Sequence, residues 1–333
     1  GATYTSISNP NLTWEKSKQL DVAVDYGFFG NRIAGTIEYY LKRSTDLLWS
    51  VTLPLESGYQ SSLTNVGVLD NRGIEFTINS VNVNSNSFQW VTSFNITHNK
   101  NNVVELYDGK TDINKSIFVG HSLGEFYLLR TDGIWQVSEA SEASVYNAEP
   151  GDRKVMDIKK DNQINSEDRE FCGRSTPAYF GGLTNTFKYR NIDLIVFLNY
   201  AGGYYINNSL LRFLNSYNTW GNASVDYYNN YWKEDRPTNK YPAPRIGSSY
   251  SNGDGTDANL ENGAYIRIKN IELGYTLPQR WSGRLKTSSI RGFISVQNLF
   301  TFTRYTGYDV EAAQQSNAYP GSRATLGGIS VNF

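Results

Sequence analysis

The sequence predicts an all-β protein, the wall of a transmembrane antiparallel β-barrel with long extracellular loops. Apolar and polar side chains alternate with a period of two along nearly the whole chain, as in strands with one lipid-facing and one water-facing side. Short and long links also alternate between these segments, as periplasmic turns and extracellular loops do in outer-membrane barrels. The last such segment ends at Phe333, as the strand that closes a barrel would.

Composition is consistent with this fold and excludes several others. The 333 residues carry a net charge of −1 and no basic tract, which argues against a nucleic-acid partner. No apolar run is long enough for a transmembrane helix. The 24 Tyr, 16 Phe and 7 Trp suit interfacial girdles, although a secreted β-sandwich or carbohydrate-binding module could share them. The single Cys172 excludes an internal disulfide. The chain opens in polar sequence without a signal peptide, so we expect a mature, truncated or partial protein.

Nine strands are expected. The first has Leu20, Val22 and Val24 on one face and Asp21 and Asp25 on the other. The others show similar alternation and lie at 33–42, 73–79, 88–96, 178–189, 193–204, 264–276, 290–303 and 322–333.

The links between these strands divide by length. Short links are expected at 27–32, 81–87, 190–192 and 277–289, and long ones at 45–70, 101–177, 205–263 and 304–321. Soluble domains seldom contain such long links without structure of their own. With the chain's end on the periplasmic side, every short link also falls on that side.

One strand changes phase. Ile266 and Ile268 share one parity, whereas Ile271 and Leu273 have the other, with Asn270 between them. We interpret this as a β-bulge that keeps both apolar sets facing lipid. Bacterial single-chain barrels have even strand numbers, so nine strands indicate the C-terminal part of a larger barrel.

Four motifs together resemble the C-terminal barrel region of SusC/RagA-type TonB-dependent transporters of the Bacteroidetes outer membrane. They are NPNLTWE at 9–15, NRGIE at 71–75, YIRIKNIELGYTLP at 265–278 and VQNLFTFTRYTGYD at 296–309, followed by Glu311. The resemblance implies a barrel of about 22 strands, an N-terminal plug, a TonB box and a SusD-like lipoprotein lid. It also implies uptake of oligosaccharides or oligopeptides, driven by the proton-motive force through TonB.

We therefore expect residues 1–333 to form the C-terminal portion of one barrel domain, integral to the cell outer membrane, with plug and TonB box absent from this chain. The alternative is a passive porin-like or structural barrel without energy coupling. A soluble β-rich binding module or glycosidase fits the aromatic content but not the alternating link lengths. No enzymatic activity is expected, because His98, His121 and Cys172 have no catalytic or metal-binding context.

The segment 157–168 resembles a calcium loop of the EF-hand or dockerin type. The oxygen donors expected for the ion are Asp157, Asp161, Asn165 and Asp168. Asn162 replaces the turn glycine and tolerates left-handed backbone angles, whereas Lys159 places a cation at a ligand position. Members of the resembled family often carry a fuller acidic motif here. We expect no calcium, or weak binding, with no other cofactor.

Aromatic residues are concentrated in the long links. Most are expected to anchor the links to one another or to a lid protein, and Trp135 and Trp220 are the candidates for substrate contact. Phe333 is expected to be the recognition end for barrel assembly.

Overall fold

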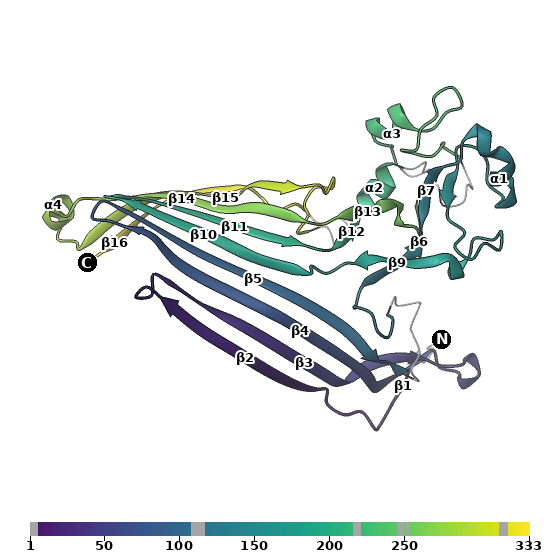
Figure 1. Ribbon diagram of the computed structural model, residues 1–333, viewed down its shortest axis with the longest axis horizontal. Helices are drawn as coiled ribbons and strands as arrows, with labels where there is room; N and C mark the ends of the chain where they lie inside the picture. Colours follow the sequence, from purple (N-terminus) through teal and green to yellow (C-terminus); the bar gives the residue numbers. More distant parts are fainter. Residues whose placement is uncertain (1–5, 108–116, 216–220, 246–249, 251–252, 313–318) are drawn as a thin grey trace, which may run out of the picture.

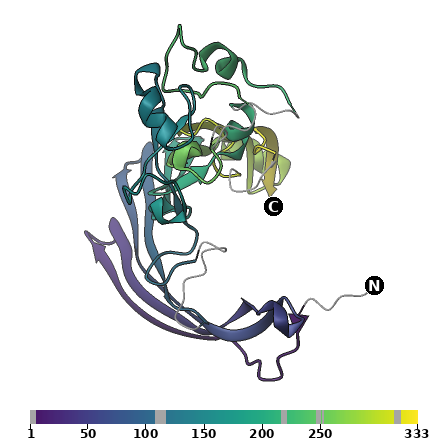
Figure 2. The ribbon, with the colours of Figure 1, turned by 90° about the vertical axis from the view of Figure 1, so that its right-hand side faces the viewer.

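In the computed structural model, nine strands follow one another in an antiparallel meander and form one curved sheet (Figure 1). The structure describes residues 6–107, 117–215, 221–245, 250, 253–312 and 319–333. The nine predicted strands are confirmed as β2 (Lys16–Phe28), β3 (Ile33–Thr52), β4 (Ser61–Asn84), β5 (Phe88–Glu105), β10 (Tyr179–Tyr189), β11 (Ile192–Gly202), β14 (Tyr265–Thr276), β15 (Ser289–Thr303) and β16 (Ala324–Asn332). A short β1 (Ser6–Ile7) pairs in parallel with β4. Viewed end-on, the sheet is an open arc with β2 and β16 at its edges (Figure 2).

The predicted long link at 45–70 is mostly strand, which corrects the expectation. β3 continues to Thr52 and β4 begins at Ser61, so only 53–60 connect them, including η1 (Leu55–Ser57). Two register shifts near Leu47 interrupt the pairing of these strands, and Asp46 adopts a positive φ of 58°. Because each irregularity shifts the phase of the alternation, this part of the hairpin has no readable period.

The predicted bulge in β14 is confirmed. The pairing of β14 with β11 and with β15 shifts register between Ile268 and Asn270. Ile266 before the bulge and Leu273 after it are both 49% exposed and lie on the same face. The extra residue therefore keeps one apolar face continuous along the strand.

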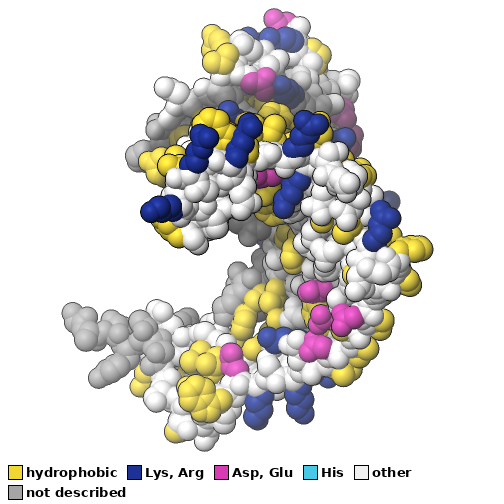
Figure 3. Space-filling model, turned by 90° about the vertical axis from the view of Figure 1, so that its left-hand side faces the viewer, with side chains coloured by type: hydrophobic (Ala, Val, Ile, Leu, Met, Phe, Trp, Pro, Cys, Tyr) yellow, Lys and Arg dark blue, Asp and Glu magenta, His cyan; other side chains and the backbone are white. Residues whose placement is uncertain are grey.

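The sheet has two chemically different faces. The outer face, which follows the convex side of the arc, carries apolar side chains that are about half to three-quarters exposed, with no second layer of described residues packed on them (Figure 3). They include Leu20, Val24, Ile37, Ile74, Ile192, Ile266, Leu273, Ile294, Phe302 and Ile329. The inner face carries the alternating polar partners. An exposed apolar area of this extent marks contact with another apolar phase.

Tyrosines lying over glycines connect strands that are not direct neighbours. Tyr40 of β3 lies over Gly73 of β4, and its hydroxyl donates a hydrogen bond of 2.9 Å to Asn99 of β5. A Cβ at Gly73 would lie 2.6 Å from the Tyr40 ring. The same arrangement recurs for Tyr26 over Gly35 and for Tyr200 over Gly181. Glycine thus makes room for a cross-strand aromatic contact.

The remaining elements lie at the two ends of the sheet (Figure 1). Beyond the end from which the long links arise stand β6 (Glu125–Leu129), β7 (Thr131–Ile134), η4 (Val137–Glu139), α1 (Ala140–Val145), β8 (Arg153–Val155), η5 (Ser166–Asp168), β9 (Arg169–Arg174), β12 (Tyr205–Asn207), α2 (Ser209–Leu214), α3 (Val225–Asn230), η6 (Asp257–Asn259) and β13 (Leu260–Asn262). The opposite, short-turn end holds α4 (Gln279–Ser282) and η7 (Gly283–Leu285). No helix among the described residues has the length and apolarity to cross a membrane.

Candidate functional site: the inner face of the sheet and the long links above it

The inner face of the first strands is acidic. Asp21 and Asp25 of β2 alternate with the outer apolar residues, and Glu38 of β3 pairs directly with Glu75 of β4. Like charges opposite each other on a sheet are unfavourable, and contact with water keeps the cost small. Such a face suits an aqueous lumen better than a protein core.

Farther along the sheet, the inner face carries balanced charges. Arg291 of β15 donates hydrogen bonds to Asp193 of β11, at 3.0 Å from Nε, and to Glu272 of β14, at 2.8 Å. The guanidinium lies over Gly274, which has no side chain to obstruct it. One arginine therefore joins three strands through their inner faces.

A second arginine holds the segment after β15 against the inner face. Arg267 of β14 forms ion pairs with Asp309 and Glu311 and donates to Thr301 at 2.8 Å. The Arg267 and Asp309 side chains are only 6% and 7% exposed. Burial would raise the pKa of Asp309, but hydrogen bonds from Arg267 and two backbone amides outweigh it, and the pKa is lowered.

The two longest links interlock into one unit at the long-link end. Arg130 and Thr131 of the first link bind Asp257 of the second, with contacts of 2.9 and 2.7 Å. The indole of Trp232 donates to Gln136 at 2.9 Å. A small buried cluster contains Ile134 from one link and Trp232 and Ala243 from the other.

Trp135, one predicted substrate contact, is 2% exposed. Its ring stacks on Tyr146, with centroids 6.0 Å apart, and lies 4.4 Å from the ammonium of Lys154. Burial leaves no free ring face there, which argues against direct substrate contact. Trp220, the other prediction, lies outside the described residues.

Other link aromatics divide between core and surface. Tyr204, Tyr227 and Trp232 are buried, and burial raises the pKa of Tyr227 to about 12. Their packing agrees with the predicted anchoring of the links to one another. Tyr228, at 72% exposed, and Tyr205, at 41%, remain open for contact with a partner or ligand.

The four predicted calcium donors lie in one tightly turned segment. Asp157 accepts hydrogen bonds from the amides of Lys160 and Asn162, at 2.6 and 2.8 Å. Asp168 is fully buried and accepts from three amides. Asp161 and Asn165 likewise accept from the amides two residues on. Asn162 has φ 63°, as expected for the glycine position.

These bonds hold the loop through its own backbone. Burial would raise the pKa of Asp157, but its bonds from backbone amides outweigh this effect and lower it. Among the described residues, no group of three or more His, Cys, Asp or Glu side chains has an arrangement that could hold a metal ion. The expectation of no calcium, or of weak binding, stays a prediction.

Sequence reasoning missed a polar hollow at the junction of sheet and links. It occupies about 380 Å³ between Lys100, Arg174 and Tyr205, with Gly120, Gly173 and Gly203 in its wall. His121 contributes too, and it does have an acidic neighbour: Nδ1 lies 3.1 Å from Glu125. The only available signal was the pair's spacing of four residues, which is uninformative outside a helix. Nearby, burial raises the pKa of the Cys172 thiol and so disfavours the thiolate.

Comparison with known proteins supplies the context for this geometry. No protein-family model matches the chain. It is 32% identical, over its whole length, to TonB-dependent receptor P3 of Formosa agariphila and 29% identical to TonB-dependent receptor SusC of Bacteroides thetaiotaomicron. It superimposes on a structure of the RagAB peptide transporter with a TM-score of 0.82 and 23% identity over 98% of its length.

Over its whole length the chain resembles the barrel region of SusC/RagA-type TonB-dependent receptors and has the fold of that region. It spans 36% of receptor P3, 34% of SusC and 36% of the RagAB chain. In this barrel segment, the outer face is the barrel's outside, the inner face lines the lumen, and the interlocked links stand over one mouth.

Proposed function

We propose that this chain supplies nine wall strands and the extracellular links of a SusC-like importer in the cell outer membrane. The importer takes up oligosaccharides or oligopeptides beneath a SusD-like lipoprotein lid, and TonB acts through a plug region. Substrate passes along the polar inner face when the plug is pulled. The chain itself has a transport role and no catalytic one.

The observation that carries this proposal is the two-faced wall in a chain that matches TonB-dependent receptors from end to end. Apolar residues such as Leu20 and Leu273 are about half exposed on the outside, and charged residues such as Glu38, Glu75 and Arg291 face inward. A bilayer covers the first set and water the second. RagAB, whose structure the chain resembles, is a peptide transporter, which favours peptides over glycans as the first substrates to test.

The alternative is a passive porin-like barrel. Energy coupling separates the two, since an importer of this kind loses uptake when TonB is deleted or the proton-motive force is collapsed, whereas a pore does not. The full receptor that contains this chain would be expressed in its host, and uptake of labelled oligopeptides and oligosaccharides measured with and without TonB. Unchanged uptake without TonB would refute energy coupling.

Two further measurements test the location and the lid. Membrane fractionation should place the receptor in the outer membrane, with heat-modifiable migration on gels. A lipoprotein should co-purify with it in mild detergent. Recovery in the aqueous phase without detergent would contradict the membrane location, and a receptor purified alone under every mild condition would contradict the lid.

A further inference from the structure

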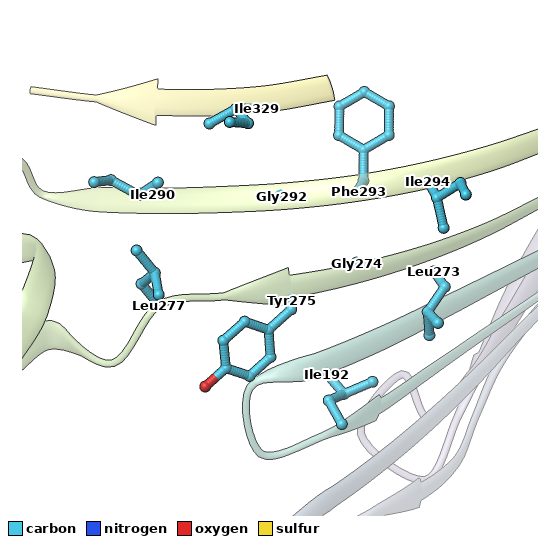
Figure 4. A pocket seen from close by; sticks show the side chains of 10 residues that line it. All are labelled: Ile192, Leu273, Gly274, Tyr275, Leu277, Ile290, Gly292, Phe293, Ile294 and Ile329. Atoms are coloured by element: carbon cyan, nitrogen blue, oxygen red, sulfur yellow. The ribbon is translucent and has the colours of Figure 1, made fainter. Parts of the chain in front are cut away.

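A groove of about 590 Å³ lies on the outer face at the short-turn end, between β14, β15 and β16 (Figure 4). Its lining is apolar: Ile192, Leu273, Tyr275, Leu277, Ile290, Phe293, Ile294 and Ile329, with Gly274 and Gly292. The volume lies within the ~300–1,000 Å³ typical of ligand sites.

The groove exists because Gly292 has no side chain. Gly292 pairs with Tyr275 on one side and Ile329 on the other, at a position where each neighbour carries a large outward group. A Cβ built on Gly292 would meet nothing within 4 Å, and its φ is not positive. A larger residue would therefore fit there without backbone strain and fill the groove.

The end of this groove adjoins a basic link. Leu277 and Ile290 line the groove, and a backbone hydrogen bond of 2.8 Å between them closes the base of the link. The link carries Arg280, Arg284 and Lys286 and no carboxylate. All three cations are exposed, and none forms an ion pair with a described residue. Figure 3, which views the molecule from this end, shows Lys and Arg side chains gathered among hydrophobic ones.

Aromatic residues place this region at a membrane interface. Tyr275 is 47% exposed at the end of β14, and Trp281, in α4, is 52% exposed. Such residues lie where hydrocarbon meets headgroups. The groove is thus at acyl-chain depth, and the basic link is at headgroup depth.

We propose that the groove and the basic link form a binding site for one anionic phospholipid of the periplasmic leaflet. An acyl chain lies in the groove over Gly292, and the headgroup phosphate pairs with Arg280, Arg284 and Lys286. Charge complementarity selects this occupant, because an apolar partner would leave three cations unpaired and a soluble anion would leave the groove empty. The inference rests on the outer-membrane location proposed above.

Native mass spectrometry of the purified full receptor tests the site. Delipidated receptor is titrated with palmitoyl-oleoyl phosphatidylglycerol and, separately, with the zwitterionic phosphatidylcholine of the same chains. Wild type should bind one phosphatidylglycerol about tenfold more tightly than phosphatidylcholine, because each cation near an anionic headgroup adds to affinity. Equal binding of the two lipids would overturn the proposal.

Two variants separate headgroup from chain. The triple variant Arg280→Gln, Arg284→Gln and Lys286→Gln should lose the preference while still binding phosphatidylcholine. Gly292→Leu should weaken both lipids several-fold. If the triple variant kept the wild-type preference, the proposed headgroup contacts would be refuted. If Gly292→Leu bound both lipids as wild type does, the proposed acyl-chain groove would be refuted.

The control variant is Lys159→Gln, Lys160→Gln and Lys233→Gln, which removes three exposed cations at the opposite end and should leave lipid binding unchanged. Heat-modifiable migration confirms that each variant is folded. Membrane fractionation, run independently, tests the proposed location, so its failure is distinguishable from failure of the lipid site.

Discussion

Replacing Arg267 should release the segment that follows β15. Arg267→Ala leaves Asp309 buried at 7% exposure without its main partner, whereas Glu311 keeps Lys269, Asn199 and Tyr265. Removing one partner of a buried ion pair costs about 3–5 kcal/mol. At about 3 kcal/mol, the population in which this segment is detached from the wall should rise on the order of 100-fold.

Hydrogen exchange on the full receptor measures this release directly. The amides of Glu311 and Gly321 donate to Asp309 at 3.0 and 2.8 Å, so their exchange reports on the tether. Both should exchange on the order of 100-fold faster in Arg267→Ala. Lys269→Gln is the matched control: it removes a more exposed partner of Glu311 and should cost less than about 1 kcal/mol. Unchanged exchange in Arg267→Ala, or an equal effect of Lys269→Gln, would refute the reasoning.

The remaining predictions concern acid, packing, lipid and calcium. The folded-state pKa of Asp309 is lowered below its ordinary value of 3.8. The ion pair of Asp309 with Arg267 should therefore hold above pH 3.8 and weaken as the pH falls through the folded-state pKa. The Glu311 and Gly321 amides, corrected for their intrinsic exchange rates, should exchange faster only in acid. Gly73→Val should lower the heat-modification midpoint by displacing Tyr40, a cost of about 1–3 kcal/mol, whereas Gly292→Ala, into open space, should not. Leu273→Arg, two residues from the interfacial Tyr275, should destabilise the receptor in bilayers by about 1 kcal/mol; unchanged unfolding would contradict lipid contact. Calcium should leave proteolysis of 157–168 unaltered, and protection at micromolar calcium would reverse that expectation.

Local patterning made most of the wall predictable. Period-two alternation identified nine strands, and the parity change at Asn270 identified the bulge, since both follow from which face each side chain occupies. Alternation predicts no strand where its phase is lost, as at the register shifts near Leu47 in the extended β3–β4 hairpin.

Contacts distant in sequence were not predictable in this way. Arg267 meets Asp309 across 42 residues, and Trp232 meets Gln136 across 96. No local period encodes such pairs. The burial of Trp135 follows from the same interlocking of links, so an aromatic that looked available to substrate belongs to the interior of the loop assembly.

The bonds from Arg130 and Thr131 to Asp257, and from Trp232 to Gln136, fasten two hairpin loops to each other. A change of length or shape in one loop must be matched in the other, or buried polar groups lose their partners. We therefore expect related receptors to differ in both loops together, and not in one loop alone. An engineered chimera that transplants only one of them should misfold at the mouth while its barrel still assembles.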